Sequence, residues 1–111
     1  MVGILRREGL SEGTVVVELD KSAFSLLKRA LSIEYRRLQL ELKMTKEKIR
    51  EFEKKYGMSS SRFLERYARG ELGDEEEFME WYGELKFLEK VSKELEELKN
   101  IADKISKELS K

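Results

Sequence analysis

Cysteine, histidine and proline are all absent from this chain, and each absence narrows what the protein can be. Without cysteine there is no disulfide, no thiolate nucleophile and no cysteine-bound metal. Without histidine the chain lacks the commonest general base and the commonest metal ligand. Without proline, the residue that most strongly breaks helices is missing. We therefore expect a protein that is not an enzyme, needs no cofactor and is built from long helices.

Side-chain amides are also scarce, since only Gln39 and Asn100 carry one. Charged residues instead make up 41 % of the 111 residues, against about 25 % in an average globular protein. Lys and Arg number 23, as do Asp and Glu, so the formal net charge is zero. Many Lys and Glu with few amides are typical of a thermophilic source. The length suits one small domain.

Long apolar runs are missing as well. The longest, such as Val15 to Val17, fall far short of the roughly 20 residues that a bilayer span needs. Arg6 and Arg7 follow the first apolar residues, which is not the order of a signal peptide. We expect a cytoplasmic protein with no membrane partner.

The hydrophobic pattern predicts an all-α fold in a single helical domain over residues 1–111, which begins with a short β-containing arm over residues 1–19. In the arm, residues 14–19 alternate like a strand, with Val15, Val17 and Leu19 on one face. Residues 4–6 are a candidate partner strand. A lone hairpin is marginal in water, so this strand needs further cover.

A first long helix is predicted over residues 20–56. Asp20 or Ser22 can cap its start, and Gly57 provides the expected stop. Its apolar residues recur at steps of three and four, which forms a heptad-like seam with one gap at Thr45. The seam residues are Phe24, Leu27, Leu31, Tyr35, Leu38, Leu42, Ile49, Phe52 and Tyr56.

A short helix over residues 59–69 and a second long helix over residues 74–109 complete the chain. Gly70 ends the short helix, and Asp74 with Glu77 forms a capping box at the start of the long one. The second long helix carries an apolar seam of its own. Its members are Phe78, Trp81, Leu85, Leu88, Val91, Leu95, Leu98, Ile101, Ile105 and Leu109.

The two long helices carry opposite charge. Residues 21–56 hold 11 basic and 5 acidic side chains, a net of +6, whereas residues 71–111 hold 7 basic and 13 acidic ones, a net of −6. The two apolar seams can pack together, and the opposite charges beside them attract. These features predict that the helices fold back on each other as an antiparallel hairpin.

A second apolar stripe on the first long helix predicts self-association. A hairpin of two such thin helices buries little surface on its own, and a helix that is apolar on two sides is usually covered on two sides. We expect a homo-oligomer, most simply a homodimer of coiled-coil hairpins forming a helical bundle, with dimer and tetramer both open. The self-association candidates are Leu26, Ile33, Leu40 and Met44, with Ala30 between them and Met79, Tyr82 and Phe87 extra on the second long helix.

Two charged clusters have both a functional and a structural interpretation. The carboxylates of residues 74–77, Glu80 and Glu84 could bind Mg²⁺ or Ca²⁺, but acidic groups also stabilise helix starts, which we favour. The basic stretch of Lys28, Arg29, Arg36 and Arg37 could contact nucleic acid phosphates. Attraction to the acidic long helix explains that stretch more simply, so nucleic acid is a minor candidate partner.

An aromatic cluster is predicted near the connector between the long helices. It comprises Tyr56, Phe63, Tyr67, Trp81 and Tyr82. Such clusters usually form core, although Tyr and Trp also anchor protein interfaces. The alternative is therefore a partner-binding surface at this connector.

The connector resembles a known family. The run Lys55-Tyr56-Gly57-Met58-Ser59, the turn Gly70-Glu71-Leu72-Gly73-Asp74 and the pair Glu80-Trp81 are similar to those of small archaeal and cyanobacterial antitoxin-like proteins of toxin–antitoxin operons. The resemblance covers roughly residues 50–85. It implies a non-catalytic protein that binds and restrains a small toxin. Antitoxins usually carry a disordered tail, whereas here the apolar period continues to Leu109.

Together these features predict a helical protein-binding module, antitoxin-like, that also binds itself. Its partner could add a strand to Val15, Val16 and Val17. One alternative is a purely structural homo-oligomeric coiled-coil assembly. A second alternative is a DNA-binding transcriptional repressor.

Overall fold

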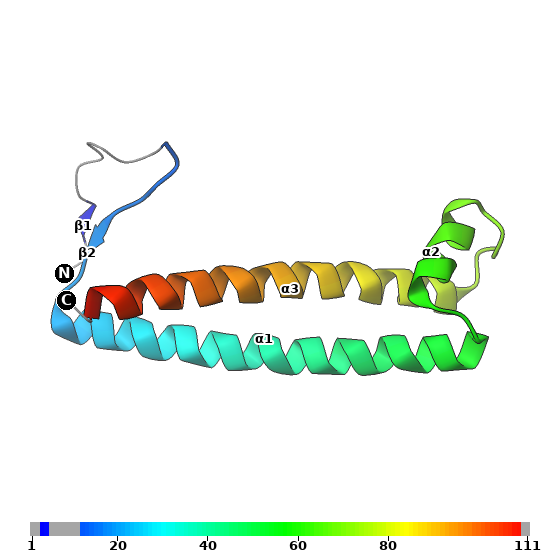
Figure 1. Ribbon diagram of the computed structural model, residues 1–111, viewed down its shortest axis with the longest axis horizontal. Helices are drawn as coiled ribbons and strands as arrows, with labels where there is room; N and C mark the ends of the chain where they lie inside the picture. The colour runs from blue at the N-terminus through cyan, green and yellow to red at the C-terminus, as the bar shows by residue number, and fades with distance from the viewer. Residues whose placement is uncertain (1–2, 5–11, 110–111) are drawn as a thin grey trace. The chain divides into compact units, whose positions relative to one another are not determined.

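The computed structural model describes residues 3–4 and 12–109. Within these residues the elements are β1 (Gly3–Ile4), β2 (Val17–Glu18), α1 (Lys21–Tyr56), α2 (Ser60–Ala68) and α3 (Glu76–Leu109) (Figure 1). The predicted helical fold with a short N-terminal strand is confirmed. The chain divides into two compact units, residues 1–34 and residues 35–111, and α1 contributes to both.

The first unit contains a minimal antiparallel pair of strands. Gly3 lies opposite Glu18 and Ile4 lies opposite Val17, so the predicted pairing of Ile4 with the strand is confirmed. Leu5 and Arg6 fall outside the described residues. The second strand covers two residues rather than the predicted 14–19. Val15 is 60 % exposed, so an apolar alternation alone did not extend the strand.

Both ends of α1 are closed by local chemistry. At the start, the Ala23 N–H donates to Asp20 Oδ1 over 2.8 Å, which identifies Asp20 rather than Ser22 as the cap. At the end, Gly57 has a φ of +60°, a left-handed conformation that favours glycine. The Met58 N–H donates to the Glu53 carbonyl over 3.3 Å, so the chain leaves the helix in a tight, bonded turn.

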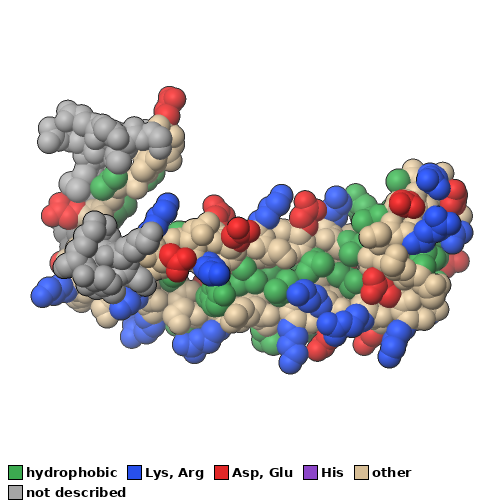
Figure 2. Space-filling view, viewed as in Figure 1, with side chains coloured by type: hydrophobic (Ala, Val, Ile, Leu, Met, Phe, Trp, Pro, Cys, Tyr) green, Lys and Arg blue, Asp and Glu red, His purple; other side chains and the backbone are tan. Residues whose placement is uncertain are grey.

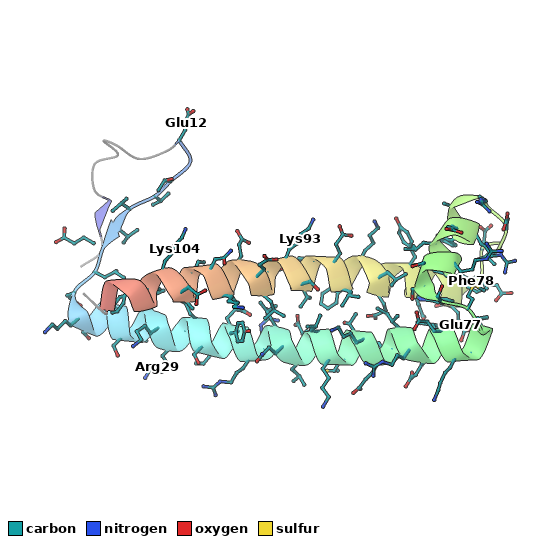
Figure 3. The ribbon with its side chains drawn as sticks, viewed as in Figure 1. Glu12, Arg29, Glu77, Phe78, Lys93 and Lys104 are labelled. Atoms are coloured by element: carbon teal, nitrogen blue, oxygen red, sulfur yellow. The ribbon has the colours of Figure 1, made fainter. Side chains whose placement is uncertain are left out.

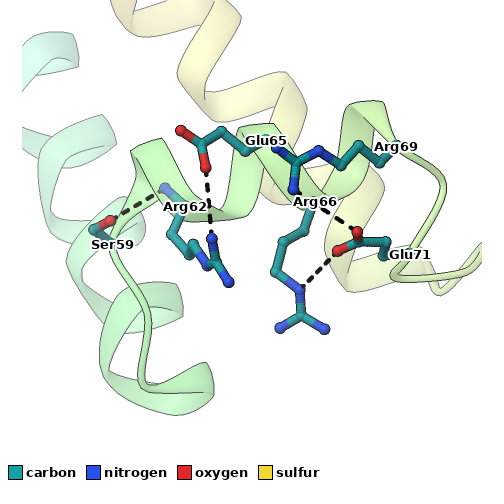
Figure 4. Close-up of polar contacts among 6 residues, drawn as sticks. All are labelled: Ser59, Arg62, Glu65, Arg66, Arg69 and Glu71. Carbon is teal, nitrogen blue, oxygen red and sulfur yellow. Dashed lines mark hydrogen bonds and ion pairs between the residues drawn. The ribbon is translucent and has the colours of Figure 1, made fainter.

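The short helix α2 is held by its own side chains. Ser59 caps it by accepting from the Arg62 N–H over 3.1 Å, and Gly70, with a φ of +72°, follows its end. Three ion pairs lie along the helix and the turn after it: Arg62–Glu65, Arg66–Glu71 and Arg69–Glu71 (Figure 4).

The long helix α3 begins at Glu76, two residues later than the predicted start at residue 74. Its first turn is closed by the Phe78 and Met79 N–H groups, which both donate to the Glu75 carbonyl. Glu77 takes a different role from the predicted capping box. Its carboxylate accepts from Lys55 and Tyr56 of α1, so a contact between helices has replaced a local one.

In the second unit, residues 35–56 of α1 and α3 pack together along the predicted seams (Figures 1 and 2). Thr45, the gap in the seam of α1, is itself buried at 4 % exposure. It keeps the register of the heptad but contributes a smaller side chain than Leu would. The buried residues of this unit are Leu38, Thr45, Ile49, Phe63, Phe78, Trp81 and Val91.

We expect Phe63→Ala to lower the free energy of unfolding by about 3 kcal/mol or more, because truncating a completely buried Phe leaves a large cavity. Leu64→Ala, at the next position of α2, is the matched control. Leu64 is 37 % exposed, so its truncation should cost under about 1 kcal/mol. Urea unfolding followed by circular dichroism measures both. Equal costs for the two variants would contradict the assigned core.

Candidate functional site

The rings of Phe52, Tyr56 and Phe63 stack around the only tryptophan of the chain, Trp81. Its ring lies parallel to Phe63, with centroids 4.0 Å apart and 8° between the planes. Phe52 stacks on it as well, at 5.6 Å and 11°. Trp81 and Phe63 are both completely buried. This stack therefore joins α1, α2 and α3 in one cluster, here called the tryptophan core.

The polar edge of Trp81 is satisfied by a short hydrogen-bond chain. The indole Nε1–H donates to Ser60 Oγ over 3.1 Å. Glu53 Oε2 accepts from both the backbone N–H and the hydroxyl of Ser60, at 2.8 and 2.9 Å. A buried indole needs such a partner. Glu53, near the end of α1, thus holds the start of α2. Ser60 in turn accepts the hydrogen bond from Trp81 of α3.

A second polar contact closes the same end of the unit. Glu77 Oε1 accepts from Lys55 Nζ over 2.5 Å, and Glu77 Oε2 accepts from the Tyr56 hydroxyl. Glu77 and Phe78 lie at the beginning of α3, beside the last turns of α1 (Figure 3). The hydrogen bond from Lys55 lowers the pKa of Glu77 most, and the hydrogen bond from Tyr56 lowers it further. The hydrogen bond that the Tyr56 hydroxyl donates to Glu77, together with partial burial, raises the pKa of Tyr56 to about 12.

The five predicted connector residues come together, but they differ in exposure. Phe63 and Trp81 are completely buried and cannot contact a partner directly. Tyr56 and Tyr67 are half-buried. Tyr82 is 37 % exposed and packs on Tyr67, with centroids 5.4 Å apart. The cluster is therefore core, and only its Tyr67–Tyr82 margin offers surface.

The predicted self-association residues are all exposed. In the first unit, Leu26 and Ile33 are 57 % and 58 % exposed. In the second unit, Leu40 and Met44 are 58 % and 51 % exposed. These side chains contribute to neither core, so they are available for contacts outside the chain. Val15 and Val17 of the first unit are exposed too, whereas Val16 is half-buried.

A surface hollow of about 620 Å³ lies between α1 and α3 in the second unit. Phe52 and Gly83 line it, together with a set of charged side chains: Lys48, Glu51, Lys55, Glu77, Glu80 and Glu84. A second hollow of about 360 Å³ is lined by Glu41, Met44, Thr45, Lys48, Glu84 and Phe87. Since Lys48 and Glu84 line both, the two form one continuous surface, which we name the α1–α3 groove.

Some members of the charged clusters have structural partners. Arg37 pairs with Glu41 over 2.5 Å, and Lys48 pairs with Glu84 over 3.5 Å. Lys28, Arg29 and Arg36 are exposed. Across residues 3–4 and 12–109, no group of three or more carboxylates is placed to hold a metal ion.

The sequence pattern did not identify three residues that contribute to this core and its hydrogen bonds: Ser60, Glu53 and Thr45. Ser60 and Glu53 look like ordinary helix-end and helix-surface residues, and Thr45 looks like a break in the seam. A sequence signal existed only for Thr45, whose position continues the heptad. The roles of the other two depend on contacts seven and 21 residues apart.

Comparison with protein-family models, curated proteins and solved structures gave no match. Over the described residues, none of the helices combines the length and apolar character that a bilayer crossing requires.

Replacing Glu77 with Gln should make stability less dependent on pH in the acid range. The folded-state pKa of Glu77 lies below its ordinary value of 4.5, so its contribution is present above pH 4.5 and is lost as pH falls through the folded-state pKa. We expect Glu77→Gln to be less stable than the wild type at pH 7, with the difference closing in acid. Thermal unfolding at a series of pH values measures this.

Glu76→Gln is the matched control, because Glu76 lies in the same first turn of α3 but is exposed. It should remove the same charge from the helix start with a smaller loss at pH 7. A pH-independent difference between Glu77→Gln and the wild type would contradict the assigned contacts.

Proposed function

We propose that this chain is a non-catalytic protein-binding module built as an antiparallel helical hairpin. One observation carries the proposal: large apolar side chains are exposed on the second unit, away from its core. They are Leu40, Met44, Leu64, Met79, Tyr82, Phe87 and Ile101. Isolated exposed apolar residues are normal, but contiguous ones mark interaction surfaces. Met44 and Phe87, from different helices, line the same hollow.

The order of contacts between the long helices supports the antiparallel arrangement. Lys48 pairs with Glu84, and Lys55 pairs with Glu77. The residue number thus falls along α3 as it rises along α1. A connector of one short helix suits such a reversal.

Self-association through α1 is part of the proposal. Leu26, Ile33 and Leu40 recur at intervals of seven, and each is more than half exposed. Pairing of two chains along this stripe would cover it and produce a dimeric helical bundle.

The proposed partner is a small protein that this module restrains, as an antitoxin restrains a toxin. The connector sequence, with its two glycine stops and early Trp, supports this through its resemblance to antitoxin-like proteins. Capture of the tagged chain from its native host tests it. The expected result is a small stoichiometric partner that stops growth when expressed alone and no longer does so when this chain is co-expressed.

Recovery of untagged copies alone would contradict partner binding and favour the structural coiled-coil assembly. Nucleic acid that co-purifies and is removed by salt would instead favour the DNA-binding repressor.

Leu40→Asp should weaken self-association at least about tenfold, because a charge replaces a large apolar side chain that the dimer would bury. Gln39→Asp is the matched control, since Gln39 is also exposed on α1 and the added charge is the same. Sedimentation equilibrium gives both dissociation constants. Equal constants for the two variants would rule out the α1 stripe as the dimer contact.

A further inference from the structure

Glycine at position 83 leaves the α1–α3 groove open. Gly83 lies within α3, where a glycine costs helix stability relative to alanine. A Cβ added there would meet nothing within 4 Å. The residue is therefore not required by packing inside this chain. Its effect is to leave room above Phe52 in the larger hollow.

The charges around this opening do not balance. Lys48 is paired with Glu84, and Lys55 is paired with Glu77. Glu51 and Glu80 also line the hollow, and within the described part of the chain neither side chain forms an ion pair or hydrogen bond. Two carboxylates, one from each long helix, thus remain without a cation at this end of the groove.

The other end of the groove contains two exposed apolar side chains among its charged ones. Met44 and Phe87 are 51 % and 37 % exposed, and buried Thr45 lies between the helices beside them. Met44 precedes Glu51 by seven residues on α1, which corresponds to about 10.5 Å along the helix. The groove therefore presents an apolar site and an acidic site separated by two helical turns.

We propose that the α1–α3 groove binds an amphipathic helix of the partner protein, which inserts a large apolar side chain beside Met44 and Phe87. Two turns away, a Lys or Arg of the same partner helix enters over Gly83 and pairs with Glu51 and Glu80. This deepens the proposed function, on which it rests, by assigning the surface and the chemistry of the partner. Helix-in-groove binding through spaced anchors is a common recognition mode.

Charge complementarity selects this occupant over a second copy of the chain. Two grooves facing each other would bring the unpaired carboxylates of both copies together, which is unfavourable. A basic side chain of a partner protein would instead neutralise the carboxylates of Glu51 and Glu80. Leu26, Ile33 and Leu40 do not line the groove, so they remain available for self-association, whereas Met44 is assigned to the partner.

A direct test uses a synthetic helical peptide with Leu and Arg seven residues apart in an Ala- and Gln-rich background. Isothermal titration calorimetry should detect binding to the wild-type protein, and Arg→Glu in the peptide should weaken it at least about tenfold. Glu80→Lys in the protein should reverse this preference, so that the Glu peptide binds better than the Arg peptide. A wild-type protein that binds neither peptide, or does not distinguish them, would overturn the proposal.

We expect Gly83→Leu to fill the opening and keep the fold, since an added Cβ meets nothing within 4 Å and Leu favours helix. It should abolish peptide binding while leaving thermal stability equal or higher. Ser92→Leu, at an exposed position of α3 that does not line the groove, is the matched control and should bind like the wild type. Equal binding by Gly83→Leu would overturn the assignment.

The same variants separate this inference from the proposed function. If wild type and Gly83→Leu capture the same partner equally from the host, the groove is not the binding site although the module still binds a protein. Loss of capture with Gly83→Leu alone supports the groove.

Discussion

Stacking of Trp81 between Phe52 and Phe63 is the interaction on which the second unit depends. Each of the three rings comes from a different helix, and the centroids of the closest pair are 4.0 Å apart. Burial of large aromatic faces supplies much of the stabilisation available to so small a chain. The stack therefore fixes the end of α1, the start of α3 and the position of α2 together.

Polar contacts then make this core specific. Trp81 can donate to Ser60 only if α2 begins where it does, and Glu53 must approach from α1 to hold that serine. Partly buried hydrogen bonds of this kind penalise other arrangements, since a displaced partner leaves an unsatisfied group. In a chain without disulfides, the junction of three helices is held by the aromatic stack, the hydrogen-bond chain through Ser60 and the contacts of Glu77 with Lys55 and Tyr56.

Much of the fold was predictable because its causes are local. The seams of both long helices follow from apolar spacing, and Gly57 and Gly70 mark helix ends through their left-handed backbone. The strand was overpredicted, since residues 14–19 alternate like a strand but β2 covers only Val17–Glu18, and Val15 remains exposed. Glu77 was assigned to a cap, whereas it contacts Lys55 and Tyr56. Local patterns cannot indicate contacts between residues more than 20 positions apart.

The candidate site was predicted less well than the fold. Exposed apolar residues such as Leu40 and Met44 were identified from spacing, because a residue outside the seam points away from it. The α1–α3 groove was not, since it requires Glu51, Glu80 and Gly83 to come together from two helices. For Phe63 and Trp81 the sequence left both interpretations open, because a buried aromatic and an interface anchor have the same sequence signature. Only packing distinguishes them.

Hydrogen exchange of the Trp81 indole tests the tryptophan core most directly. With one tryptophan, the ¹⁵N-labelled protein should give a single indole Nε1–H signal in its NMR spectrum. We expect this proton to exchange as slowly as the most protected backbone amides of α1 and α3, because the ring is completely buried and bonded to Ser60. Exchange at the rate of an exposed indole would contradict the account, since the three helices would then not be joined by Trp81.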